Sequence, residues 1–153
     1  MNQDHPKLTF TYPTFLKVGM VAVGPFLPDI GWEVTNFPSK LKMYISVGLL
    51  LNSKRPYSYD ISIYGPNSEE IKDGVGVLES RLLSTAVSNE DDFVSISTNL
   101  FEDITVNSPG LYRIHCRLYA GKAESDEKET IDQLDSYFAI AEDWRSNTMA
   151  KKE

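Results

Sequence analysis

Two residues that could form a catalytic pair, His115 and Cys116, stand side by side in the stretch NSPGLYRIHCRLYAG, residues 107–121. A histidine next to a cysteine could activate the thiol as a nucleophile. Apolar and polar residues alternate along this stretch, however, which predicts a half-buried strand. Because successive side chains of a strand point to opposite faces, His115 and Cys116 would not meet. We therefore expect a shielded Cys116 on the apolar face and no catalytic role for His115.

The polar face of the same strand carries three basic side chains, Arg113, His115 and Arg117. A catalytic base needs a second residue that orients it, and the sequence identifies none. We interpret these three residues as a polar stripe that makes secondary contacts with a partner.

Other patterns that support catalysis or metal binding are absent from the sequence. It contains no P-loop, no H-E-x-x-H, no G-x-S-x-G and no paired C-x-x-C. Its two histidines and single cysteine cannot supply a His/Cys metal cluster. The sequence therefore predicts a protein that is not an enzyme and that has no catalytic residue, no metal site and no cofactor.

The composition is globular, since 41% of the 153 residues are hydrophobic and 24% are charged, enough for one buried core. A net charge of -7 argues against binding to nucleic acid or to an anionic membrane, which depends on clustered Lys and Arg. One cysteine excludes an internal disulfide, and no secretory signal or membrane-length apolar run is present. We expect a single cytoplasmic domain over residues 1–153.

Strand patterns dominate the chain. Alternation with a period of two predicts strands at FLKVGMVAV, LKMYISVGLL, YSYDISIY, DFVSIS, FEDITV, the 107–121 stretch and DSYFAIA. Residues 75–87 fit either a strand or a short helix, and we favour a strand. Seven or eight short strands joined by turns predict an all-β fold, an antiparallel Ig-like, Greek-key β-sandwich. Its core is expected to include Val18, Met43, Ile45, Ile61, Ile63, Ile114, Cys116, Leu118 and Phe138.

Turn residues Pro109 and Gly110 precede Tyr112. A tyrosine at the start of such a strand can bond back to the local backbone, as in the tyrosine corner of Greek-key sandwiches. The alternative is a tyrosine that is simply packed in the core. Short flexible tails are expected at residues 1–12 and 144–153.

A long connection from Gly24 to Lys40 carries the aromatic residues Phe26, Trp32 and Phe37. Long irregular connections are often functional, and aromatic side chains anchor partners. We expect these three residues to bind a macromolecular partner. In the alternative they fold back onto one end of the sandwich, or IGWEVTNF forms an edge strand.

A second connection, Ala120–Thr130, is almost entirely polar. Its carboxylates and the one that follows could offer oxygen ligands to calcium: Asp126, Glu127, Glu129 and Asp132. The spacing of an EF-hand is absent, so a plain solvated loop is favoured.

The order of NFPSKLKMYISVGL, YSYDISIYGPNSEEI and ITVNSPGLYRIHCRLY resembles small bacterial and phage β-sandwich proteins of unassigned function. In these, a strand ending in a G-P or D-x-x-G turn is followed later by an F-x-x-P-G-x-Y strand. The resemblance spans about Phe37 to Ile140. It implies a sandwich fold and a bacterial or phage setting, and it brings no catalytic residues to carry over.

The predicted function is a non-enzymatic protein-interaction module, an inhibitor or adaptor that binds a macromolecular partner. The competing hypothesis is a carbohydrate- or calcium-binding accessory domain, in which Trp32 stacks on sugars and the carboxylates of residues 124–132 hold the ion. An enzyme that uses carboxylates from separate strands is the third hypothesis. The oligomeric state is left open.

Overall fold

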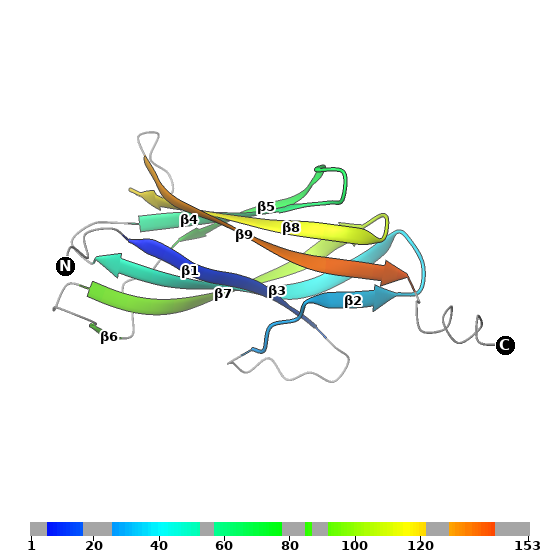
Figure 1. Ribbon diagram of the computed structural model, residues 1–153, viewed down its shortest axis with the longest axis horizontal. Helices are drawn as coiled ribbons and strands as arrows, with labels where there is room; N and C mark the ends of the chain where they lie inside the picture. The colour runs from blue at the N-terminus through cyan, green and yellow to red at the C-terminus, as the bar shows by residue number, and fades with distance from the viewer. Residues whose placement is uncertain are drawn as a thin grey trace.

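The computed structural model describes residues 6–16, 26–52, 57–77, 85–86, 92–121 and 129–142. These residues form two sheets that lie face to face (Figure 1). The strands are β1 (Lys7–Phe15), β2 (Gly31–Val34), β3 (Ser39–Asn52), β4 (Tyr57–Tyr64), β5 (Glu70–Val77), β6 (Thr85–Ala86), β7 (Asp92–Val106), β8 (Gly110–Ala120) and β9 (Glu129–Glu142). Within the described residues, no helix is long and apolar enough to cross a membrane.

The strand order is that of an Ig-like sandwich. One sheet has the order β1-β3-β7-β6 and the other β2-β9-β8-β4-β5, which corresponds to the A-B-E-D and G-F-C sheets of Ig domains, with strands added at the edges of the second. Paired strands are antiparallel except β2 and β9, which are parallel. The predicted antiparallel sandwich is confirmed, although nine strands lie in the described residues instead of seven or eight.

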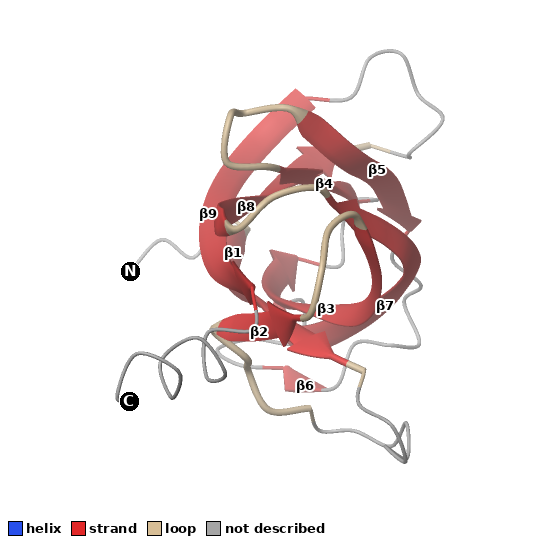
Figure 2. Cartoon of the chain, turned by 90° about the vertical axis from the view of Figure 1, so that its right-hand side faces the viewer, coloured by secondary structure: helices blue, strands red, loops and turns tan. Residues whose placement is uncertain are grey.

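The hydrophobic core lies between the two sheets, which curl around it (Figure 2). Because side chains alternate along a strand, every second residue of β3, β4 and β8 points into this space. The described members of the predicted core are all buried: Met43, Ile45, Ile61, Ile63, Ile114, Cys116, Leu118 and Phe138. Val18 lies outside the described residues. Burial of these inward faces removes apolar surface from water and is the main favourable contribution to folding.

The turn between β7 and β8 forms a tyrosine corner, as the sequence predicts. The Tyr112 hydroxyl donates a hydrogen bond to the Ser108 carbonyl oxygen at 2.6 Å. The Tyr112 ring is fully buried and stacks on Phe138, with 5.4 Å between the ring centroids. The corner therefore joins the turn to the core.

We expect Tyr112→Phe to lower the free energy of unfolding by about 1–2 kcal/mol, because the ring still packs but the Ser108 carbonyl loses its donor. Urea denaturation measures this change. The matched control is Tyr137→Phe on the exposed side of β9, which should change stability by less than about 0.5 kcal/mol. Equal losses in the two variants would contradict the role of the corner.

Part of the expected N-terminal tail is strand. Residues 7–12, assigned to a tail, lie in β1, which pairs with β3 at the edge of its sheet. The alternation of β1 is hard to recognise because the register shifts between Leu8 and Phe10 and because Pro13 stands inside the strand. Proline is tolerated there because an edge strand leaves some backbone groups unpaired. Residues 17–23 of the expected strand FLKVGMVAV and the expected tail at 144–153 lie outside the described residues.

Two expected strands join into one. DFVSIS and FEDITV both belong to β7, which pairs with β3 along its whole length apart from a register shift between Leu41 and Met43. The described parts of residues 75–87 are strand, at the end of β5 and in β6. Residues 78–84 lie outside the described part of the chain.

Candidate binding face

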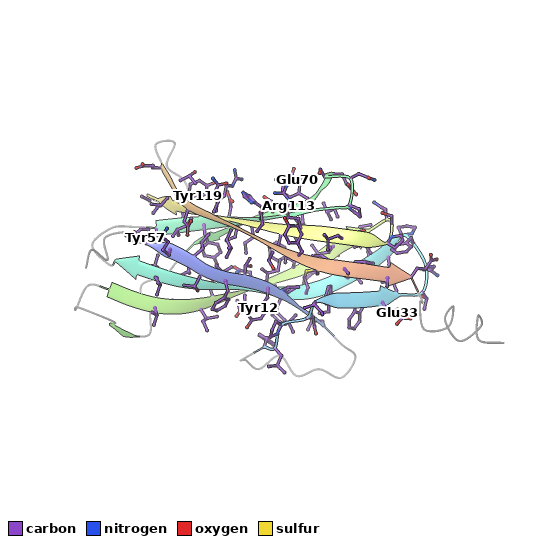
Figure 3. The ribbon with its side chains drawn as sticks, viewed as in Figure 1. Tyr12, Glu33, Tyr57, Glu70, Arg113 and Tyr119 are labelled. Carbon is purple, nitrogen blue, oxygen red and sulfur yellow. The ribbon has the colours of Figure 1, made fainter. Side chains whose placement is uncertain are left out.

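The outer side of the five-stranded sheet brings the predicted polar stripe next to carboxylates from two other strands. Strand pairing sets three residues in each row across β4, β8 and β9. The rows are Asp60, Arg117 and Gln133; Ser62, His115 and Asp135; and Tyr64, Arg113 and Tyr137. We call these nine residues, together with Tyr119, the charged face; Arg113 and Tyr119 mark its position in Figure 3.

Asp60 binds two neighbours at one end of the charged face. Its carboxylate accepts hydrogen bonds from Arg117 Nε at 3.1 Å and Nη2 at 3.4 Å, and from the Tyr119 hydroxyl at 2.7 Å. Burial acts to lower the pKa of Arg117, but the hydrogen bonds and negative charge of Asp60, together with smaller contributions from Tyr119 and Tyr64, leave the pKa raised. Arg117 therefore stays charged, and the nearly buried carboxylate has the partners that its burial requires.

Asp135 binds two other residues in the middle of the charged face. Its Oδ1 lies 2.6 Å from His115 Nδ1 and 3.5 Å from Arg113 Nη1. His115 Nε2 lies 3.1 Å from Gln133 Oε1, so both ring nitrogens have oxygen neighbours. The Arg113 guanidinium also lies 4.5 Å from the centroid of the Tyr64 ring, a cation–π contact.

One row of the charged face, Ser62, His115 and Asp135, has the residue types of a hydrolase triad. The geometry does not support that chemistry. Ser62 is only 1% exposed, so a substrate carbonyl could not reach its hydroxyl, and His115 Nε2 is directed to Gln133. Cys116 is buried on the opposite side of β8, so the prediction that His115 and Cys116 face apart is confirmed.

Exposed apolar side chains lie beside the charged residues. Leu111 is 59% exposed and Tyr137 is 51% exposed, and both lie on the outer side of the sheet one row from each other. Protein interfaces are enriched in tyrosine and arginine, which combine a large apolar body with a polar group. The charged face therefore offers an interaction surface in which aromatic and aliphatic contacts adjoin oriented charges.

The six residues expected to bind a partner do not gather in one place. Trp32 lies in β2 and stacks on Phe15 with 5.4 Å between ring centroids, and Phe37 packs against the core. Phe26 stacks on Tyr44 at 4.4 Å, on the outer side of the other sheet. The alternative from the sequence, in which the aromatic residues fold back and IGWEVTNF supplies an edge strand, holds for residues 31–34. Partner binding by these three aromatic residues stays a prediction.

Sequence reasoning missed the carboxylates that organise the charged face, Asp60 and Asp135. Alternation does assign both to the polar sides of their strands. What it cannot supply is the register that sets Asp60 opposite Arg117 and Asp135 opposite His115. The sequence does contain one signal for this network, the pattern of charge. Acidic residues lie on the polar sides of the flanking strands β4 and β9, and basic residues lie on the polar side of the central strand β8.

The acidic residues that the calcium-binding alternative would use lie partly outside the described residues. Among the described residues, no group of three or more His, Cys, Asp or Glu side chains could hold a metal ion. Asp132 accepts a hydrogen bond from the backbone nitrogen of Leu8 at 2.8 Å. This carboxylate therefore connects β9 of the five-stranded sheet to β1 of the four-stranded sheet.

Comparison with known proteins gives information on the fold alone. No protein-family model matches the chain, and no curated protein matches it. Two solved structures share its Ig-like sandwich, with TM-scores of 0.51 and 0.56 at 12% sequence identity.

Both structures are crystal forms of a bacterial adhesin from Mobiluncus mulieris containing intramolecular disulfide, isopeptide and ester bond cross-links. The matches cover 89% and 90% of this chain but 57% of the adhesin chain, so this chain spans little more than half of the adhesin's length. The resemblance to a bacterial β-sandwich protein stated from the sequence is confirmed in this coarser form.

The comparison corrects the expected location. The cytoplasm was inferred from the absence of an internal disulfide and of a recognisable secretory signal. The structural resemblance to a bacterial adhesin contradicts that inference. A sandwich with a full hydrophobic core does not need a disulfide to be stable outside the cell, so the lack of an internal disulfide does not indicate the compartment.

Proposed function

We propose that this chain is a non-enzymatic adhesion or binding module that acts outside the cytoplasm and binds a protein partner through the charged face. The observation that supports this most strongly is the pairing of oriented charges with exposed apolar groups on one sheet. Arg113 is held between Asp135 and the Tyr64 ring, next to the exposed Tyr137. The likeness of the fold to an adhesin domain supports the same class of function.

The charged face suits binding because its side chains are already held in place. The entropic cost of ordering a long side chain at an interface is about 0.5–1.5 kcal/mol. Arg113 and Arg117 have each lost part of that freedom through contacts with Asp135 and Asp60. Their side chains keep 34% and 37% of their surface exposed, so a partner can still contact them.

The cross-links named for the adhesin are not part of this proposal. This chain has one cysteine, so an intramolecular disulfide cannot form in it. The sugar-binding alternative gains no support, because one face of Trp32 is occupied by Phe15. Binding by the charged face is therefore the function that we propose.

The test is capture of partners from cell-surface extracts of the source organism and of cells it contacts, followed by quantitative mass spectrometry. We expect the native chain to recover a protein that Arg113→Glu binds about 30-fold more weakly, the loss typical of an interface residue worth about 2 kcal/mol. The control Lys40→Glu makes the same change of charge on the opposite sheet, where Lys40 is exposed, and should keep the partner. Melting curves check that both variants fold.

Equal retention of the partner by Arg113→Glu and Lys40→Glu would exclude the charged face as the binding site. Failure of the native chain to recover any protein, under conditions in which it is folded, would contradict the proposed function itself. Loss of the partner in Lys40→Glu alone would move the site to the four-stranded sheet.

A further inference from the structure

One edge of the four-stranded sheet is covered over only a short length. β7 pairs with β3 along one of its edges, but within the described residues its other edge pairs only with β6, at Phe93 and Val94 (Figure 1). The stretch Ile96–Leu100 therefore has a neighbouring strand on one side only in the described part of the chain. We call the other side of this stretch the β7 edge. An edge of this kind presents a row of backbone N–H and C=O groups to another chain.

Contacts from the opposite sheet hold this stretch of β7 in place. The Tyr59 hydroxyl of β4 lies 2.6 Å from Ser97 Oγ and donates a hydrogen bond to Asn99 Oδ1 at 2.7 Å. Asn99 Nδ2 donates to the Ile45 carbonyl oxygen at 3.2 Å. Because these bonds fix the inner side of β7, the β7 edge has the geometry of a strand before any further strand pairs with it. A binding site that is already ordered loses less entropy when it binds.

The outward side chains beside the β7 edge are apolar or β-branched. Ile96 and Leu100 are 63% and 45% exposed, and Thr98 between them is exposed as well. A sandwich strand usually buries its apolar residues and exposes its polar ones, whereas β7 buries Ser95 and Ser97 here. Side chains of neighbouring strands contact each other across a sheet. A strand added at the β7 edge would therefore cover Ile96 and Leu100 with its own side chains.

The opposite edge of the same sheet, on β1, is protected against such pairing. Pro13 has no backbone N–H, and its carbonyl oxygen accepts a hydrogen bond from the Asp29 backbone nitrogen at 2.8 Å. The Phe15 N–H donates to the Asp29 carboxylate at 2.8 Å. Prolines and charged side chains on edge strands prevent pairing with other chains. Ile96–Leu100 contains neither a proline nor a charged residue, so the β7 edge lacks this protection.

Acidic side chains mark one end of the β7 edge. The register of β3 and β7 shifts between Leu41 and Met43, and the β7 residues opposite Lys42 are Glu102 and Asp103, both exposed. Two carboxylates therefore face one ammonium group, and the net charge at this end is negative. An antiparallel partner strand, the more stable arrangement, would begin at this end. Its first residue would be basic, because opposite charges on neighbouring strands attract.

We propose that the β7 edge binds an extended segment of a partner protein, which adds an antiparallel strand to the four-stranded sheet. The edge determines this kind of partner, because only an extended backbone can bond to a row of alternating N–H and C=O groups. The segment is basic next to Glu102 and apolar next to Leu100 and Ile96. This site is distinct from the proposed function, since the charged face belongs to the five-stranded sheet.

The probe is the capped peptide acetyl-KSVSTSV-amide, which sets its lysine next to Glu102 and its valines next to Leu100 and Ile96. Fluorescence anisotropy of the labelled peptide should show saturable binding as the full chain is titrated to about 500 µM. Leu100→Lys should weaken binding about fivefold, because the apolar contact with valine is lost. Leu111→Lys makes the same change at an exposed leucine of the other sheet and should bind like the native chain. Melting curves check that both variants fold.

Two N-methylated peptides test whether the backbone is bound. One carries methyl groups on the nitrogens of the odd-numbered residues and the other on those of the even-numbered residues. Successive N–H groups of a strand point to opposite edges, so only one version keeps the donors that face β7. We expect that version to bind like the parent peptide and the other to bind at least about tenfold more weakly. In the native chain, the parent peptide should slow amide hydrogen exchange at alternate residues of Ile96–Leu100.

Equal binding of the two methylated peptides would overturn strand addition, as would a native chain that does not bind the parent peptide. Alternate residues of Ile96–Leu100 whose exchange is equally slow with and without peptide would also overturn it, because the β7 edge would then be paired within the chain itself. Arg113→Glu should leave peptide binding unchanged. Loss of the peptide in Arg113→Glu but not in Leu100→Lys would place the peptide on the charged face and contradict this site.

Discussion

Replacing Phe138 by alanine is expected to lower the free energy of unfolding by about 3–5 kcal/mol, the usual cost of deleting a buried ring. Phe138 is 1% exposed and lies between two other aromatic residues. It stacks on Tyr112 at 5.4 Å and meets Phe15 edge-on at 5.5 Å, measured between ring centroids. The cavity would open where β1, β8 and β9 converge. Since a domain is typically stable by about 5–15 kcal/mol, this variant should be close to unfolding at 37 °C.

Urea denaturation followed by circular dichroism measures the change, with Tyr137→Ala as the matched control. Tyr137 precedes Phe138 on the same strand but points outward and is 51% exposed. Its truncation should cost less than about 1 kcal/mol. Similar losses in the two variants would show that β9 does not have the alternation found in the structure.

Local alternation was enough to predict the core and the class of fold. Ile61 and Ile63 on β4, and Ile114 and Leu118 on β8, each recur at every second position, and that period alone assigns them to a buried side. Tyr112 could be predicted in its corner because the Pro-Gly turn and the tyrosine are neighbours in sequence. All of these features depend on residues that lie close together in the chain.

Features that alternation could not predict depend on partners far away in sequence. β7 buries serines because Tyr59, about forty positions earlier, provides hydrogen bonds from the other sheet. Trp32 occupies an edge strand because β2 pairs with β9, which follows it by about a hundred residues. The residues next to Ser97 and Trp32 do not identify these distant partners, so local patterns favoured a binding loop for Trp32 and offered the edge strand only as the alternative.

On the charged face, too, some features depend on neighbours in sequence and others on distant strands. Alternation predicts that Arg113, His115 and Arg117 share one side of β8, and this is confirmed. The contacts of these residues with Asp60 and Asp135 depend on register between strands, and a shift of one residue would place both carboxylates on the inner side. The sequence therefore predicts the basic stripe but not the network that holds it.

Cys116 is expected to react with a thiol reagent about 1,000-fold more slowly in the folded chain than in urea-unfolded chain at pH 8, because only the thiolate reacts. The side chain is completely buried. Burial, followed by the negative charges of Asp60 and Asp132, raises the pKa of the thiol from 9.0 to about 12. Stopped-flow absorbance with Ellman's reagent, with and without urea, measures both rates. Comparable rates would show that Cys116 is accessible and that β8 is misassigned.

The same raised pKa predicts a loss of stability at alkaline pH. Well below pH 9 the thiol is protonated in both the folded and the unfolded chain, so it adds no pH dependence there. Between about pH 9 and 12 the unfolded chain releases the proton while the folded chain keeps it, and stability falls by roughly 1 kcal/mol for each pH unit. Tyr59, whose pKa burial also raises above 10.0, adds a loss in the same direction. Urea denaturation at pH 8, 9.5 and 10.5 should give a shallower decline of stability for Cys116→Ala than for the native chain, because the variant lacks the thiol. Identical slopes would mean that the Cys116 thiol titrates alike in both states.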